Sequence, residues 1–418
     1  MGIKMSSKMK QKELSELNDP LPIRVIIFDD TQTTLNFAKL KLGPFYDHDI
    51  TNKDSLYYDK RFIQLMEKLL SLKQFELSPD SVSMTILRNP KLLAEMFSIV
   101  KRKGIKQKYR WYVWVNLANY DETAPLPMSH QEIYQECLKK NLGQDEEIII
   151  KDAMRTFRDH ELFKDPNGLG LKMLARICRG LGAYFPKVGY VQGMNYLVGF
   201  LLEVSGFDEV LTWFFIINLF KKKKNLYFAL YEPNFPLVFL KIHLFWSILN
   251  KTKPKLAAKL KKIEVPSEMW IFKWFVTLYT SILTKEYLLR VWDFLVVGDI
   301  FSSVYVALVI VRYLKKIIMN ESMSDFVEVV NDPQRLCSNF QMYKFFKKLK
   351  DYRLDLPAKL ELINTYEPEA KKSGIDCSYV FSTMRSFFSD PNTANDFGYV
   401  ADYETIEREL DNDFDNEK

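Results

Sequence analysis

Cysteine and histidine are scarce in this chain, and neither is grouped. The four cysteines (Cys137, Cys178, Cys337 and Cys377) lie far apart with no CxxC spacing, and the four histidines are equally scattered. This distribution argues against a zinc site and against a disulfide framework. It is typical of a protein kept in a reducing, cytosolic location.

Long hydrophobic runs are also missing. The longest apolar stretches, around Val210–Phe220 and Phe301–Val311, are shorter than the roughly 20 residues that an α-helix needs to cross a bilayer. The N-terminus is polar and rich in lysine, which is unlike a signal peptide. The sequence therefore predicts a soluble protein.

Glycine and proline are few, at 15 and 17 residues in 418, whereas 47% of the chain is apolar, so the composition is globular. The net charge of +6 conceals an asymmetry: residues 402–418 hold eight acidic and two basic residues, so this tail carries −6 and the remainder +12. A mildly basic body suits an acidic partner or an anionic membrane surface. No basic stripe interleaved with aromatic residues is present, which argues against a nucleic-acid partner.

Apolar residues recur at three- and four-residue spacing from Met84 onward, as they do in helices that bury one face. The predicted helical segments are Leu93–Val100, Tyr109–Leu117, Ile133–Leu138, Leu171–Leu181, Tyr196–Val204, Glu209–Phe220, Trp270–Leu283, Leu288–Val297 and Ser302–Ile318. Alternating strands are absent from this stretch. We therefore predict an all-α domain over residues 91–350, with a helical array as the alternative.

The flanking segments differ from this domain. Residues 1–20 form a basic N-terminal arm, and residues 21–90 form a small mixed region with one strand-like run, Ile23–Phe28, and no assigned role. Residues 351–390 are predicted to be a C-terminal helical extension. Residues 391–418 are predicted to be an acidic, disordered tail.

The N-terminus fits a lipidation pattern. Gly2 follows the initiator and Ser6 stands in the required place, with several lysines after it. One acyl chain binds membranes only marginally, so a basic cluster is the second signal that such an anchor needs. The pattern predicts myristoylation of Gly2 and a peripheral membrane contact. The alternative is that a glycine follows the initiator by coincidence.

Two short segments combine residues suited to phosphoryl chemistry. In Ile149–Thr156, Asp152 stands three residues before Arg155, so on a helix the two side chains share a face and can pair. Such a pair would restrain a guanidinium that must dock on an anion. The alternative for the pair is an ordinary surface ion pair of little consequence.

The second segment centres on Gln192, which lies between Gly189 and Gly193. The glycines permit unusual backbone angles and the close approach of another backbone. A glutamine at such a turn can both donate to and accept from a water molecule. The alternative is a glutamine that caps a helix.

These segments resemble the signature motifs of the TBC family of Rab GTPase-activating proteins, written loosely as IxxDxxRT and YxQG. Two further blocks are similar to that family: Gly104-Ile105 with Arg110 and Trp114 resembles its opening, and Arg290–Asp293 with Gly298 resembles its RVWD…G motif. The four blocks stand in the family's order between about residues 104 and 345. Lys106 and Arg158 stand where the family usually has proline.

The resemblance implies an activator that completes the active site of a GTP-bound Rab GTPase and turns over no substrate of its own. Arg155 would supply an arginine finger, and Gln192 would replace the water-positioning glutamine of the GTPase. The supporting residues would be Asp152, Thr156, Tyr190, Gly193 and Asn195. Arg110, Trp114, Trp292 and Asp293 would be scaffold. GTP and Mg²⁺ would belong to the partner, and the chain would hold no cofactor or metal.

Other interpretations of the sequence are weaker. The run after Val25 lacks the second carboxylate of a haloacid-dehalogenase motif, Gly168-Leu169-Gly170 lacks the third glycine of a dinucleotide-binding loop, and no Walker loop exists. A Rab-binding adaptor with the same fold and little catalysis is the alternative function. The lysine runs Lys221–Lys224 and Lys251–Lys262 are interpreted as solvated helix ends, with a membrane or GTPase contact as the alternative.

Overall fold

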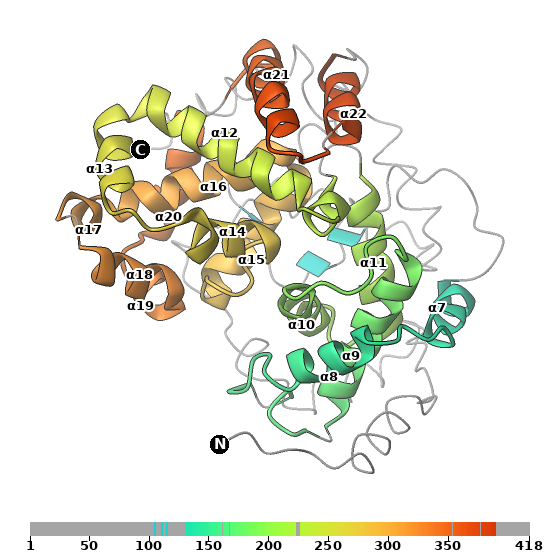
Figure 1. Cartoon of the computed structure of the whole chain (residues 1–418). Helices are drawn as coiled ribbons and strands as arrows, with labels where there is room; N and C mark the ends of the chain where they lie inside the picture. The colour runs from blue at the N-terminus through green and yellow to red at the C-terminus, as the bar shows by residue number, and fades with distance from the viewer. Residues whose placement is uncertain are drawn as a thin grey trace, which may run out of the picture. The chain divides into compact units, whose positions relative to one another are not determined.

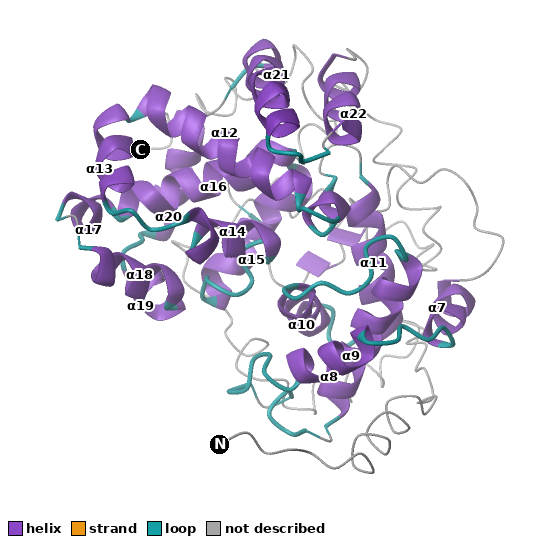
Figure 2. Cartoon of the chain, viewed as in Figure 1, coloured by secondary structure: helices purple, strands orange, loops and turns teal. Residues whose placement is uncertain are grey.

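The structure is a computed structural model that describes residues 104–105, 110–111, 114–115, 130–160, 162–166, 168–222, 226–320, 322–352, 354–376 and 378–389. Every regular element in these ranges is a helix (Figure 1), and Figure 2 shows no strand among them. This confirms the predicted all-α class. The helices belong to two compact units, one within residues 130–217 and the other within the described parts of 104–115 and 218–389.

The first unit is built around one central helix. Its helices are α7 (His130–Leu138), α8 (Asp145–Ala153), α9 (Leu169–Tyr184), α10 (Met194–Val204) and most of α11 (Glu209–Lys221). α9 packs against α7, α8 and α10. A Cβ on Gly180 of α9 would lie 2.7 Å from the ring of Tyr134 and 2.9 Å from Nε1 of Trp213. The missing side chain therefore lets α7 and α11 approach α9 closely.

A buried ionic cluster joins three of these helices. Arg176 of α9 donates from Nε and Nη2 to the two carboxylate oxygens of Glu209 in α11, at 2.7 and 2.6 Å. The hydroxyl of Tyr134 in α7 donates to the same carboxylate at 2.6 Å. Burial, together with the nearby Glu209, raises the pKa of Tyr134, so this hydroxyl keeps its proton. The charge on Glu209 is thus satisfied by three donor groups from two residues where little water reaches it.

The second unit contains the remaining helices. They are η1 (Tyr227–Leu230), α12 (Pro236–Thr252), α13 (Pro254–Lys262), η2 (Ser267–Met269), α14 (Ile271–Val276), α15 (Lys285–Val297), α16 (Ile300–Tyr313), α17 (Lys315–Met319), α18 (Met323–Asn331), α19 (Pro333–Ser338), α20 (Met342–Leu349), η3 (Lys350–Tyr352), α21 (Leu356–Lys372) and α22 (Ser378–Ser389). The core helix is α16, because every residue from Ile300 to Val311 is buried. A helix that is apolar all round must be enclosed by neighbours, and α12, α14, α15 and α20 pack against it.

The helices of residues 351–390 are fixed to this core by a buried ion pair. Lys359 of α21 donates from Nζ to Oδ2 of Asp299 at 2.6 Å, and both side chains are buried. Asp299 also caps α16, accepting from the backbone N–H of Phe301 at 2.9 Å. The predicted helical extension therefore contains α21 and α22, and α21 also packs against α12.

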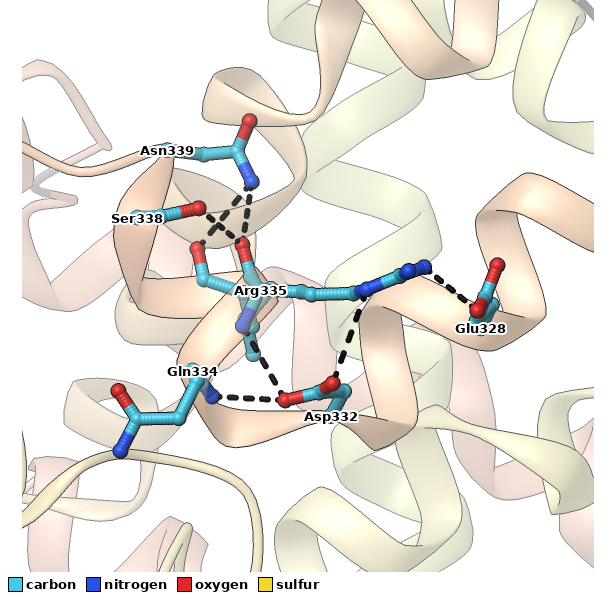
Figure 3. Close-up of polar contacts among 7 residues, drawn as sticks. Glu328, Asp332, Gln334, Arg335, Ser338 and Asn339 are labelled. Carbon is cyan, nitrogen blue, oxygen red and sulfur yellow. Dashed lines mark hydrogen bonds and ion pairs between the residues drawn. The ribbon is translucent and has the colours of Figure 1, made fainter.

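Side-chain capping defines the boundary between α18 and α19 (Figure 3). The Asp332 carboxylate accepts from the backbone N–H groups of Gln334 and Arg335 at 2.9 and 3.2 Å. The guanidinium of Arg335 reaches back to Glu328 of α18 at 2.5 Å. An aspartate cap followed by Pro333 at the first helical position is a common way to begin a helix.

Two predicted segments were each wrong as single helices. The segment Trp270–Leu283 is helical only to Val276 (α14), and Leu278 and Tyr279 then adopt φ angles of 46° and 69°. Tertiary bonds hold this turn, since Trp292 Nε1 donates to the carbonyl of Leu278 at 3.1 Å. The segment Ser302–Ile318 divides at Leu314 into α16, which the Asp299 cap starts at Ile300, and α17.

The other predicted segments that the structure describes in full correspond to α7, α9, α10, α11 and α15. Among the described helices, none is both long and apolar enough to cross a membrane. The N-terminal arm with Gly2, the region 21–90, the segment Leu93–Val100 and the tail 391–418 lie outside the described residues. Lys222 is buried, so its prediction as part of a solvated helix end was wrong.

Candidate functional site

Arg155 lies at the surface immediately after α8. Its Nη2 is 2.7 Å from Oδ1 of Asp152, in the last turn of that helix. The Asp152 side chain is 4% exposed, whereas that of Arg155 is 41% exposed. One edge of the guanidinium is therefore tethered to a buried carboxylate while the side chain stays open to solvent.

Asp152 also contacts the second motif. The hydroxyl of Tyr190 donates to Oδ2 of Asp152 at 2.9 Å, and Tyr190 is buried. Burial raises the pKa of Tyr190, and the nearby Cys178 and Asp152 add to this effect. The hydroxyl therefore remains a donor, and each oxygen of the Asp152 carboxylate has a partner.

A second set of hydrogen bonds links the same two motifs. The hydroxyl of Thr156 donates to the carbonyl of Asp152 at 2.7 Å, and Nδ2 of Asn195 donates to Oγ1 of Thr156 at 2.7 Å. The backbone N–H of Gly193 then donates to Oδ1 of Asn195 at 2.9 Å. Thr156 and Asn195 are both buried. The segments around Arg155 and Gln192 are thus joined twice through buried polar side chains.

Gln192 is presented by a tight turn before α10. Gly189 has a φ of 68°, and Gly193, which caps α10, has a φ of 115°, so both have the backbone angles that the glycines were predicted to permit. The Gln192 side chain is exposed, and its amide has no hydrogen-bond partner among the residues that the structure describes. The amide is therefore free to contact a partner molecule, and the helix-capping interpretation is not supported.

Asp145 is a site residue that the sequence analysis missed. Its Oδ2 accepts from the backbone N–H of Tyr190 at 3.0 Å, and a Cβ on Gly189 would lie 2.8 Å from the same oxygen. Asp145 precedes Asp152 by seven residues, which places the two carboxylates on one face of α8. That spacing was the signal available in the sequence.

The residues predicted as scaffold lie in the second unit. Asp293 is fully buried and accepts from Nε of Arg110 and Nε1 of Trp114, each at 3.0 Å, and from the backbone N–H of Ile105 at 3.0 Å. The rings of Trp114 and Trp292 are 5.8 Å apart. These contacts connect Ile105, Arg110 and Trp114 to α15, and all of these side chains are buried. Within the described ranges, no group of three or more His, Cys, Asp or Glu side chains is placed to hold a metal ion.

Comparison with known proteins agrees with the motif resemblance. The sequence model of the Rab-GTPase-TBC domain matches residues 107–319. The chain is 27% identical over 208 residues to growth hormone-regulated TBC protein 6 of Caenorhabditis elegans, covering 50% of this chain and 58% of that protein. It is 30% identical over 213 residues to TBC1 domain family member whacked of Drosophila melanogaster, covering 50% of this chain and 56% of that protein. The chain thus spans little more than half the length of these two relatives.

Solved structures show the same fold. The flagellar RabGAP TBC domain of Chlamydomonas superposes with a TM-score of 0.53 at 17% identity, over 85% of this chain and 98% of that one. The Ypt/Rab-GAP domain of Gyp1p superposes with a TM-score of 0.51 at 16% identity, over 70% of this chain and 99% of that one. Because the family model covers half of the sequence and includes both motifs of the site, the chain belongs to the Rab-GTPase-TBC domain family.

Proposed function

We propose that this chain accelerates GTP hydrolysis on a Rab-family GTPase in its GTP-bound form, with Arg155 and Gln192 supplied in trans. Family membership supports the class of partner. The observation that carries the proposal is the pair of buried connections, Tyr190 to Asp152 and Asn195 to Thr156, which join the segments presenting two exposed side chains.

The chemistry of the two side chains suits this role. Charge builds on the transferred phosphoryl group during GTP hydrolysis, and a guanidinium stabilises it through charge-assisted hydrogen bonds. A glutamine amide orients the attacking water, because it donates and accepts at once. The partner brings GTP and Mg²⁺, so this chain turns over no substrate of its own.

The tether on Arg155 supports a preorganised finger. A freely rotating arginine loses conformational entropy when it docks, and positioning errors near 1 Å cost about 100-fold in rate. The bond to Asp152 restricts that freedom and engages Nη2, so N–H groups elsewhere on the guanidinium can meet phosphoryl oxygens.

Single-turnover GTP hydrolysis against a panel of Rab GTPases tests the proposal. Arginine fingers contribute about 10³- to 10⁵-fold in rate, so Arg155→Ala should abolish most of the stimulation by this chain. Gln192→Ala should also slow stimulated hydrolysis strongly. Arg158→Ala is the matched control, because Arg158 is an exposed arginine three residues away whose Nε donates to the carbonyl of Met154 at 3.2 Å.

The control should change the stimulated rate less than tenfold, and all three variants should keep the helical content of the wild type. A fully active Arg155→Ala protein would overturn the proposal. The alternative function, an adaptor that binds Rab proteins, predicts binding to one member of the panel without any stimulation. The wild-type chain therefore separates the two functions before any variant is made.

A further inference from the structure

Eight lysines are gathered at the end of α12, on α13 and on α17, three helices of the second unit. They are Lys251, Lys253, Lys255, Lys259, Lys261 and Lys262, at the end of α12 and on α13, and Lys315 and Lys316 on α17. Lys259 is half-buried and the others are exposed. α13 packs against α17, so lysines some 60 positions apart in the chain lie on adjacent helices, and this set is called the lysine surface.

The charges of this surface act together. Neither residues 251–263 nor residues 315–319 contain an aspartate or a glutamate. The axes of packed helices lie about 8–10 Å apart, which is close to the Debye length of about 8 Å at physiological ionic strength. The fields of the two groups of lysines therefore overlap, so both groups attract an anionic surface that lies near α13 and α17.

Favourable interaction with the helix dipole explains the position of only some of these lysines. Lys259, Lys261 and Lys262 lie in the last turn of α13, where a cation is favourable. Lys253 and Lys255 instead lie at the start of α13, and Lys315 and Lys316 are the first residues of α17. A positive charge at the N-terminus of α13 is unfavourable, so the helix dipole does not account for Lys253 and Lys255. α17 has only five residues, so its dipole does not account for Lys315 and Lys316 either. Within the described ranges none of these four lysines forms an ion pair.

Exposed apolar side chains stand next to the lysines. Met319 ends α17 and is 43% exposed, and Met323 begins α18 and is 48% exposed. α17 contacts α18, so the methionines adjoin the helix that carries Lys315 and Lys316. Basic residues beside exposed apolar ones are the combination by which surfaces bind at a lipid headgroup layer.

We propose that the lysine surface binds an anionic membrane surface. The residue type favours this partner over an acidic protein, because all eight cations are lysines. Arginine is the residue that recognises a carboxylate or phosphate by a bidentate bond, whereas lysine acts as a point charge on a flexible stem. Point charges suit a diffuse layer of headgroups, and Met319 and Met323 add apolar contact with that layer. This contact is separate from the proposed GTPase-activating site.

Vesicle co-sedimentation of the full chain, without any GTPase, tests this proposal. The chain should bind vesicles made of equal parts phosphatidylcholine and phosphatidylserine, and it should not bind vesicles of phosphatidylcholine alone. Binding should disappear in about 1 M salt, where the Debye length falls to about 3 Å. Equal binding to both kinds of vesicle would overturn the proposal.

A combined variant tests the lysine surface itself. Lys255→Gln, Lys262→Gln, Lys315→Gln and Lys316→Gln together should weaken partitioning on the order of 10²- to 10³-fold, at about fivefold for each lysine. The matched control carries Lys344→Gln, Lys347→Gln, Lys371→Gln and Lys372→Gln, which are exposed lysines of α20 and α21. Both proteins lose the same charge and keep the N-terminal lysines.

The control should bind vesicles nearly as the wild type does. An equal loss in both proteins would mean that net charge alone drives binding and would overturn the proposal. Retained vesicle binding by the combined variant would do the same, even if that variant no longer bound some acidic protein. In solution without vesicles, the combined variant should stimulate GTP hydrolysis like the wild type, so a failure here is distinguishable from a failure of the proposed function.

Discussion

Asp152 is bonded to both motifs of the candidate site, and this makes it the residue on which their relative position depends. One carboxylate oxygen pairs with Arg155 and the other accepts from Tyr190, while the backbone carbonyl of Asp152 accepts from Thr156. The carboxylate is buried, so Arg155 and Tyr190 replace water that it would otherwise need.

Tyr190→Phe should therefore weaken both folding and activation. Removing the hydroxyl leaves one oxygen of the buried Asp152 carboxylate without its donor, which costs about 1–3 kcal/mol of unfolding free energy. Stimulated GTP hydrolysis should fall because the carboxylate that holds Arg155 is itself less well held. Urea denaturation and single-turnover hydrolysis measure the two effects. Tyr184→Phe is the control, since Tyr184 is a partly exposed tyrosine on α9.

A stability loss without any change in stimulated hydrolysis would show that Tyr190 does not position Arg155. Since burial raises the pKa of Tyr190, the effect of the substitution should be the same at every pH from mildly acidic to mildly alkaline. A strong pH dependence in that range would contradict the role of the hydroxyl as a permanent donor.

Among the helices, the junction of α12, α16 and α21 contains two buried lysines. Lys241 of α12 donates from Nζ to the carbonyl of Ile300 and to Oγ of Ser303, both at 2.7 Å, and is fully buried. Lys359 of α21 pairs with Asp299 beside it. Only Lys359 has a carboxylate in direct contact, so the two lysines differ in how well their charge is compensated.

Burial lowers the pKa of Lys241 to about 7, although the charge of Asp299 partly opposes this shift. Between about pH 7 and the ordinary lysine range, the unfolded chain binds a proton at Lys241 that the folded chain does not. The wild type should thus gain stability as pH rises above 7, by up to about 1.4 kcal/mol per pH unit.

Comparison with Lys241→Met isolates this effect, because other titrating groups cancel in the difference. Urea unfolding of both proteins at pH 7, 8 and 9 should show that the unfolding free energy of the wild type rises relative to that of the variant at each step. A difference that stays constant across these pH values would mean that Lys241 is protonated in the fold throughout, and the predicted linkage would be absent.

For the chain as a whole, the second unit is assembled from segments that lie on either side of the first unit in sequence. Arg110 contacts α15 through Asp293, which lies 183 residues further along the chain. Both members of this ion pair are buried. The Arg110–Asp293 ion pair closes a long loop of the chain, so its formation costs the conformational entropy of that loop.

Asp293→Asn should be strongly destabilising. The substitution keeps the shape but removes the buried charge that pairs with the guanidinium of Arg110, and breaking a buried ion pair costs about 3–5 kcal/mol. Glu286→Gln is the control on the same helix, because Glu286 is exposed and should change stability by less than about 0.5 kcal/mol. Thermal or urea unfolding followed by circular dichroism measures both. Similar stabilities for the two variants would argue against a scaffold role for Asp293.

The local sequence pattern determined most of the helices of this protein and several features of its candidate site. Three- and four-residue apolar spacing predicted α9, α10 and α15 to within a few residues at their ends, because a helix that buries one face repeats its apolar residues at that spacing. The spacing of Asp152 and Arg155 predicted that the two could pair, and the glycines around Gln192 predicted that unusual backbone angles were permitted there, which the structure shows to be positive φ angles. Each of these depends on neighbours in sequence.

Tertiary contacts decided the rest. The turn at Leu278 breaks an apolar run that has full helical periodicity, because bonds from distant side chains hold a backbone that the local sequence alone would not adopt. Asp145 belongs to the site only because the packing of α8 places its carboxylate beside the backbone N–H of Tyr190. The lysines of α13 and α17 form one surface only because those helices pack together. Periodicity reports which face of a helix is buried, whereas only the folded chain determines what that face meets.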